Sequence, residues 1–270
     1  MSNKGISQSL PRWLGNRAAG VLLHPSSLPS KQGIGTLGKE ARQFIDFLES
    51  AGFCYWQTCP VGPTGFGDSP YQVFCSSAGN PYFIDWSILV ELGLLHSSDL
   101  HRLQNLSNEH VEYGYLYREF YPVARTAFSN FKLNNSVLES KYGNFDDFKI
   151  KFSWLKGYGC FQALKSANDN EPWWLWGSKY KNSTTIDHIL VDHLDEVNFH
   201  FFLQYLFFGQ WLELKSYANQ RGIFLLGDLP IYAASDSSEV WANQNLFQIN
   251  TEISTFENVA GVPPDYFNMD

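Results

Sequence analysis

The chain has 270 residues and a formal net charge of −8, with 44% hydrophobic and 17% charged residues. The acidic balance argues against nucleic acid or an anionic membrane as a partner, because both carry negative charge. The composition is typical of folded globular proteins and excludes a disordered chain. No apolar run approaches the ~20 residues of a membrane helix, and the first residues lack the apolar core of a secretion signal. We therefore expect a cytoplasmic globular protein.

Residues 1–16 have little pattern and are expected to form a flexible lead-in. A short apolar run at 18–23 predicts a strand, and apolar residues at helical spacing predict a helix at 39–51, which Gly52 ends. A second strand is expected at 53–58. A strand, a helix and another strand in this order form a βαβ unit, which indicates parallel strands and α/β architecture.

The loop at 60–72 contains glycines, which permit tight turns, and prolines, which fix them. Gly67-Asp68-Ser69 could suggest a phosphate cradle or a serine nucleophile. However, the loop has neither the GxxxxGK[ST] pattern nor the G-x-S-x-G pattern of those sites. We therefore expect a preorganised loop that contacts a ligand.

Residues 86–220 are expected to form a long, mostly helical insertion, with helices at 113–131, 145–166 and 195–219. Apolar residues nearly encircle the last of these, as in a helix packed between a sheet and a subdomain. No pair among three nearby histidines has the spacing of metal ligands, so we expect surface or packing roles (His188, His193 and His200). Four cysteines without CxxC spacing are expected to be reduced thiols, and no metal site is predicted (Cys54, Cys59, Cys75 and Cys160).

The apolar run at 223–226 predicts a third strand, buried on both faces as in a parallel sheet covered by helices. Asp228 follows this strand, and in an α/β barrel a carboxylate there faces the mouth of the active site. Asp236 is expected to act as the N-cap of the turn after it. Several aromatic residues lie in polar or Pro/Gly-rich segments, where a platform for a flat ligand competes with a place in the core (Tyr71, Trp173, Trp174, Trp176 and Tyr266).

Several of these segments together resemble the 4-alpha-glucanotransferase family, also called amylomaltase or disproportionating enzyme. The matching segments are GVLLHPSSLP at 20–29, GDSPYQ at 67–72, AGNPY at 78–82, GDLPIY at 227–232, DSSEVW at 236–241 and VAGVPPDYF at 259–267. Their order and approximate spacing are those of the family. The resemblance spans essentially 17–267.

The resemblance implies a TIM (β/α)8 barrel with helical insertions, in an enzyme that moves α-1,4-glucan segments onto glucose or a maltooligosaccharide without a cofactor. It implies a retaining mechanism with a nucleophile, an acid/base and a third carboxylate. Carried over by motif, the substrate-binding residues are Ser69, Tyr71, Asp228, Asp265 and Tyr266. Supporting roles are implied for three further residues (His24, Asp68 and Asn80).

The family's catalytic segments, Arg-Ile-Asp-His-Phe, Ala-Glu-Asp-Leu-Gly and Thr-His-Asp-Asn, have no match here. The resemblance therefore implies that the family nucleophile and acid/base lie beyond Asp270, and no catalytic residue is assigned. Ile186-Asp187-His188 lies in the helical insertion and is expected to be coincidental.

The expected domain organisation follows from these segments. We expect 17–85 to hold two barrel strands with active-site loops, and 221–270 to hold the third strand and the start of an acceptor-side loop. On this view the barrel is incomplete and truncated. A complementary C-terminal chain is then a candidate partner beside maltooligosaccharides.

Three functions remain open from the sequence. The first is a glucanotransferase by family that is inactive as this chain alone. The second is a non-catalytic α-glucan-binding remnant. The third is an independent glycosidase that uses Asp228 with Asp236 or Asp265, which needs two carboxyls about 5–5.5 Å apart.

Overall fold

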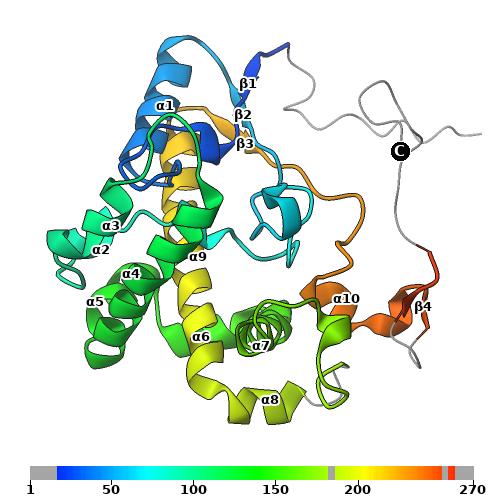
Figure 1. Cartoon of the computed structure of the whole chain (residues 1–270). Coiled ribbons are helices and arrows are strands. Elements are labelled where there is room, and N and C mark those ends of the chain that lie inside the picture. The colour runs from blue at the N-terminus through cyan, green and yellow to red at the C-terminus, as the bar shows by residue number, and fades with distance from the viewer. Residues whose placement is uncertain (1–16, 182–185, 251–254, 259–270) are drawn as a thin grey trace, which may run out of the picture.

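The computed structural model describes residues 17–181, 186–250 and 255–258. A small parallel sheet lies at one end of the long helix α9 (Leu194–Gln220), and α8 (Ile186–Asp192) lies at its other end (Figure 1). No helix within the described ranges is long and apolar enough to cross a membrane.

Part of the predicted site lies outside the described residues. Asp265, Tyr266 and Asp270 are all outside these ranges. The resemblance implies that the family's nucleophile and acid/base lie beyond Asp270. The structure therefore describes neither the predicted acceptor-side loop nor a catalytic carboxylate of the family motifs. These assignments stay predictions.

The sheet has the order β1-β2-β3, with β1 at Gly20–Leu22, β2 at Tyr55–Gln57 and β3 at Phe224–Leu226. Both pairings are parallel. These strands confirm the runs expected from the sequence, although each is only three residues long. Glycine is required at the start of β1, because a Cβ on Gly20 would lie 2.6 Å from the Cβ of Tyr55.

Helices cover one face of this sheet. Trp56 at the centre of β2 is 1% exposed, and its ring meets Phe44 of α1 (Lys39–Ser50) edge-on with centroids 5.0 Å apart. The indole Nε1 donates a hydrogen bond of 2.7 Å to the carbonyl of Leu23, just after β1. The same side of β3 packs against α9. These contacts fix the three strands against the helical layer.

The other face of the sheet is open among the described residues. Its exposed apolar side chains are Leu22, Phe224 and Leu226, which are 61%, 49% and 40% exposed. Strand register brings them together, since Leu22 and Leu226 both pair with Gln57. The expectation that 223–226 is buried on both faces is therefore wrong for this chain, because no described segment covers this side.

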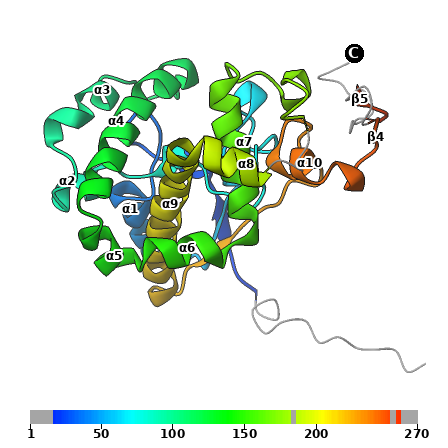
Figure 2. The ribbon, with the colours of Figure 1, turned by 90° about the horizontal axis from the view of Figure 1, so that it is seen from below.

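Two apolar clusters flank α9. One contains α1, α4 (Tyr113–Leu133) and α5 (Ser136–Tyr142), with the short helices α2 (Ser87–Glu91) and α3 (His101–Gln104) at its margin. The other contains α7 (Ser153–Ala167) and α10 (Ser238–Ala242). Figure 2 shows these two groups on opposite sides of α9. The prediction that apolar residues nearly encircle this helix is confirmed, and the structure shows the reason as packing between two clusters that are mainly helical.

The predicted helix at 145–166 is two helices. α6 (Phe145–Lys151) ends at Phe152, whose φ of −116° and ψ of 112° are extended, and α7 begins at the next residue. The Phe152 ring stacks on Phe208 of α9, with centroids 5.4 Å apart and planes 24° apart. We attribute the break to this tertiary contact, which periodicity cannot reveal. Beyond α10, β4 (Ile249–Asn250) and β5 (Thr255–Phe256) pair antiparallel.

Candidate functional site

The loops that follow β2 and β3 leave the same edge of the sheet, because the strands are parallel. Together with the segment after α7, they line an open groove of about 1240 Å³. Its lining includes Ser69, Tyr71, Trp174, Asp228 and Asp236. The groove is larger than the roughly 300–1,000 Å³ of an ordinary small-molecule pocket, which suits an extended ligand.

Tyr71 and Asp228 meet in this groove. The Tyr71 hydroxyl donates a hydrogen bond of 2.9 Å to Asp228 Oδ2, and the Leu229 amide donates one of 2.8 Å to Oδ1 of the same carboxylate. The bond to Asp228 is the largest cause that raises the pKa of Tyr71 to about 12. Both side chains are solvent-accessible. The ring can therefore pack against an apolar face of a ligand while the carboxylate accepts hydrogen bonds from its hydroxyls.

Ser69 stabilises the turn that places Tyr71 in the groove. Its Oγ accepts a hydrogen bond of 3.3 Å from the Tyr71 amide, and its carbonyl accepts one of 3.1 Å from Gln72. The preceding Gly67 and Asp68 both have positive φ, at 74° and 54°, in a tight turn. Asp68 does not line the groove. It borders a separate cavity of about 320 Å³, and burial raises its pKa.

Asn80 lies inside the protein, and His24 is partly buried. The His24 ring packs edge-on against Phe83 at 5.4 Å, and burial lowers the pKa of His24 to about 4. Its Nδ1 finds no hydrogen-bond partner among the described residues. Asn80 is 2% exposed, and its Oδ1 accepts from the Tyr82 amide at 3.0 Å. Both positions suit the support of neighbouring loops, and neither residue lines the groove.

The structure decides between the core and a ligand platform for three tryptophans. Trp173 and Trp176 are 0% and 2% exposed and belong to the second apolar cluster, so neither is a ligand platform. They are buried because α7 and α10 close over them. Trp174 is only half-buried and lines the groove, with its ring edge-on to Phe256 at 5.3 Å. Among the predicted platforms that the structure describes, Tyr71 and Trp174 line the groove.

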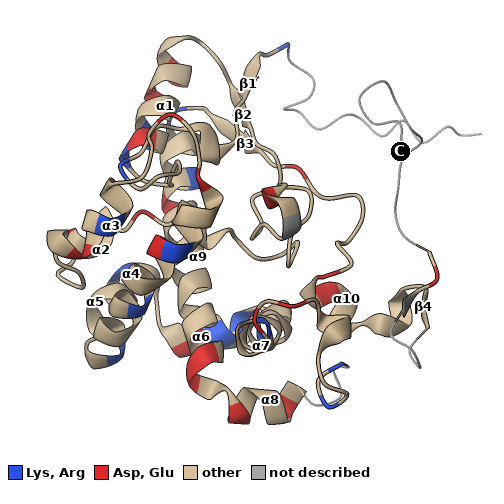
Figure 3. Cartoon of the chain, viewed as in Figure 1, with Lys and Arg blue, Asp and Glu red and all other residues tan. Residues whose placement is uncertain are grey.

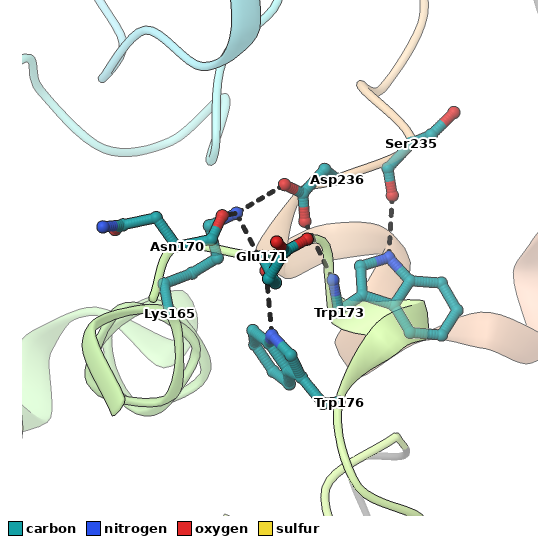
Figure 4. Close-up of polar contacts among 7 residues, drawn as sticks. All are labelled: Lys165, Asn170, Glu171, Trp173, Trp176, Ser235 and Asp236. Carbon is teal, nitrogen blue, oxygen red and sulfur yellow. Dashed lines mark hydrogen bonds and ion pairs between the residues drawn. The ribbon is translucent and has the colours of Figure 1, made fainter. Parts of the chain in front are cut away.

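Asp236 is not the N-cap that the sequence suggested. Ser237 is the N-cap of α10, because its Oγ accepts from the Val240 amide at 3.4 Å. Asp236 Oδ2 instead accepts a hydrogen bond of 2.6 Å from Lys165 Nζ (Figure 4). Lys165 is not among the site residues predicted from the sequence. One signal was present: it follows Phe161 by four residues, on the face of the predicted helix that is buried.

Charge is distributed unevenly around the groove. In Figure 3 the Lys and Arg residues lie mainly on the helices, whereas the loop after β3 carries acidic side chains. Within that loop these are Asp228 and Asp236. The described residues contain no group of three His, Cys, Asp or Glu side chains that could hold a metal ion. The groove therefore offers carboxylates, aromatic rings and loop backbone for recognition.

Comparison with known proteins identifies the family. The family model described as 4-alpha-glucanotransferase matches residues 23–270. The 4-alpha-glucanotransferase of Thermus thermophilus is 44% identical over 255 residues, which are 93% of this chain and 50% of that protein. The enzyme of the same name from Clostridium butyricum is 43% identical over 249 residues, which are 91% of this chain and 50% of that protein.

The solved structures agree. An amylomaltase from Streptococcus agalactiae, in complex with acarbose, superposes with a TM-score of 0.85 at 35% identity and covers 94% of this chain and 51% of that one. An amylomaltase from Corynebacterium glutamicum shares the fold, with a TM-score of 0.63 at 18% identity over 95% of this chain and 35% of that one. The chain spans about half the length of the curated relatives it matches. The chain belongs to the 4-alpha-glucanotransferase family.

Proposed function

We propose that these 270 residues supply part of the glucan-binding site of a 4-alpha-glucanotransferase, which moves segments of α-1,4-glucan onto glucose or a maltooligosaccharide. The observation that carries this proposal is the Tyr71–Asp228 pair in a groove at the carboxyl ends of parallel strands. Ligands of α/β barrels bind at that end of the strands. The acarbose complex of the Streptococcus agalactiae relative adds support, since it places a sugar-like ligand on a similar chain.

Within this site, Tyr71 would offer its ring to the apolar face of a sugar, and Asp228 would accept hydrogen bonds from sugar hydroxyls. Ser69 would hold the loop that carries Tyr71. By motif, Asp265 and Tyr266 would cover the acceptor side. In this proposal His24, Asp68 and Asn80 support the surrounding loops. No cofactor enters the reaction.

The mechanism we propose is retaining, with two carboxyls about 5–5.5 Å apart on either side of the scissile bond. The family's catalytic motifs have no match up to Asp270, so we assign neither carboxyl to these residues. Asp236 is held by Lys165, which leaves it poorly placed to act as a nucleophile. Asp228 is engaged by Tyr71 and by the Leu229 amide. The independent glycosidase is therefore the least supported reading.

We further propose that the remaining barrel strands would close over the open face of the sheet, where Leu22, Phe224 and Leu226 are exposed. In this arrangement 17–85 and 221–270 are barrel segments, and 86–220 is a helical insertion between them. Sequence equivalent to the second half of the relatives, in the same chain or another one, would supply the catalytic carboxylates. The expected location is the cytoplasm.

Maltotriose disproportionation by residues 1–270, with released glucose as the readout, tests this proposal together with calorimetric binding of maltoheptaose. We expect binding without turnover. Added C-terminal half of the Thermus thermophilus relative should then generate glucose release. Turnover by the chain alone that disappears in Asp228→Asn would support the glycosidase instead. Binding that no complement converts into turnover would favour the glucan-binding remnant, and an absence of binding would contradict the proposal.

A further inference from the structure

Lys165 is a buried cation beneath the groove. The residue is 3% exposed, and its ammonium donates three hydrogen bonds: 2.6 Å to Asp236 Oδ2, 2.7 Å to the Asn170 carbonyl and 3.2 Å to the Glu171 carbonyl. A lysine ammonium has three donors, so all of them are used. Lys165 is thus fully bonded to two segments that are far apart in the chain.

The first segment is the turn at 168–176, which carries Trp174 into the groove. Asp169 and Asn170 in this turn have φ of 52° and 61°, a conformation that non-glycine residues adopt at a cost and keep only where the surroundings hold them. The Lys165 ammonium stabilises this conformation, because it donates a hydrogen bond directly to the Asn170 carbonyl. Loss of this bond would let the turn relax.

The second segment is the loop at 227–237, which carries Asp228 into the groove. Further hydrogen bonds join it to the first (Figure 4). The Trp173 amide donates to Asp236 Oδ1 at 3.3 Å, and its Nε1 donates to the Ser235 carbonyl at 2.8 Å. Lys165 therefore lies at the junction of the two walls that present Trp174 and Asp228.

We propose that Lys165 is a positioning residue that sets the separation of these two walls, and thereby the preference of the site for long glucans. This inference rests on the proposed function. In this proposal a short sugar contacts Tyr71 and Asp228, whereas a chain of several glucosyl units also contacts Trp174, which lines the same groove. The affinity for the longer chain would then depend on where Lys165 holds the turn.

Calorimetry with the 270-residue chain tests this, using maltose and maltoheptaose as probes. Lys165→Met removes the ammonium and keeps the length of the side chain. We expect maltoheptaose affinity to fall about tenfold and maltose affinity to change less than about twofold, since aromatic anchors dominate binding energy. Trp174→Ala should give the same length-selective loss. The double variant should lose no more than either single variant, because Lys165 acts through Trp174.

The matched control is Lys156→Met on the same helix, which removes an exposed ion pair with Asp187 and should leave both affinities unchanged. If Lys165→Met does not fold, Asp236→Asn weakens the same junction and should give a smaller length-selective loss. Equal losses of affinity for the two sugars, or additive losses in the double variant, would overturn the inference about Lys165 but not the proposed function. If the unsubstituted chain binds neither sugar, the proposed function fails and the inference fails with it.

Discussion

The hydroxyl of Tyr71 donates a 2.9 Å hydrogen bond to Asp228 Oδ2, which joins loops 157 residues apart in the chain. The two loops follow neighbouring strands, β2 and β3, so the parallel sheet brings them together. A tyrosine ring and a carboxylate fixed to one another form a small recognition unit.

Asp228→Asn should weaken maltoheptaose binding about tenfold or more, because hydrogen bonds to a charged acceptor are stronger than those to an amide. It should also return the pKa of Tyr71 from about 12 toward its ordinary value, since the bond to the carboxylate is the largest cause of the rise. Calorimetry measures the first effect, and NMR titration of labelled tyrosine measures the second. The raised pKa stabilises the fold fully below pH 10, and this contribution is lost as the pH rises through about 12.

Tyr71→Phe is the matched control for that experiment. It keeps the ring and removes only the hydroxyl, so binding should fall less than in Asp228→Asn. The titration assigned to Tyr71 should disappear in this variant. A Tyr71 pKa that stays near 12 in Asp228→Asn would contradict the assigned cause.

Acid should destabilise the chain through His24. Burial lowers the pKa of His24 to about 4, from 6.5, so the native state favours the neutral ring. The corresponding stability is present above about pH 6.5 and is lost as the pH falls toward about 4. We expect a loss of about 2 kcal/mol, allowing for the solvent that reaches part of the ring. Urea unfolding at about pH 7, 5.5 and 4.5 measures it.

His24→Gln cannot titrate and should lose less stability across that range. A residual dependence is expected from His200, because burial lowers its pKa too. Glu196 acts at lower pH: burial disfavours its charge, but the nearby His200 ring and the hydrogen bond from Arg125 outweigh this and hold its pKa at about 2. Its contribution is lost as the pH falls from about 4.5 to about 2. An identical pH profile for His24→Gln and the unsubstituted chain would refute the role of His24.

Trp56→Ala should destabilise the chain by about 3–5 kcal/mol, the usual cost of a large cavity in a core. The residue is 1% exposed and joins β2 to α1 through Phe44 and to β1 through the Leu23 carbonyl. Trp56→Phe keeps most of the ring but loses the hydrogen bond, and should cost about 1–3 kcal/mol. Denaturant midpoints measure both. A loss below about 1 kcal/mol for Trp56→Ala would show that the sheet is not anchored at this point.

The open sheet face should promote self-association of this chain, because contiguous exposed apolar patches favour association. Phe224→Lys adds charge to the patch and should shift sedimentation toward the monomer. Since Phe224 is half-exposed, its folding stability should change by about 1 kcal/mol or less. Leu175→Lys is the control, since Leu175 is 63% exposed on a turn distant in sequence from the strands. Equal sedimentation of Phe224→Lys and the unsubstituted chain would argue against this role of the face.

Local patterns predicted most elements well. The helix at 39–51 appears as Lys39–Ser50, and the helix at 195–219 appears as Leu194–Gln220. The same patterns gave wrong or incomplete predictions where contacts with residues distant in the sequence decide the structure. The break at Phe152 accompanies a stacking contact with Phe208, and the burial of Trp173 depends on helices closing over it. Sequence neighbours carry no information about either contact.

The sequence by itself determined the family and the parallel strands and predicted Tyr71 and Asp228 as substrate-binding residues, because motifs and periodicity are written in consecutive residues. Tertiary structure alone decided that Asp236 pairs with Lys165, that only Trp174 of its neighbouring tryptophans lines the groove, and that one sheet face is open. The physical reason is that burial and ion pairing depend on which surfaces meet in space. A lysine on the buried face of a helix needs a partner, and only the folded chain shows which carboxylate supplies it.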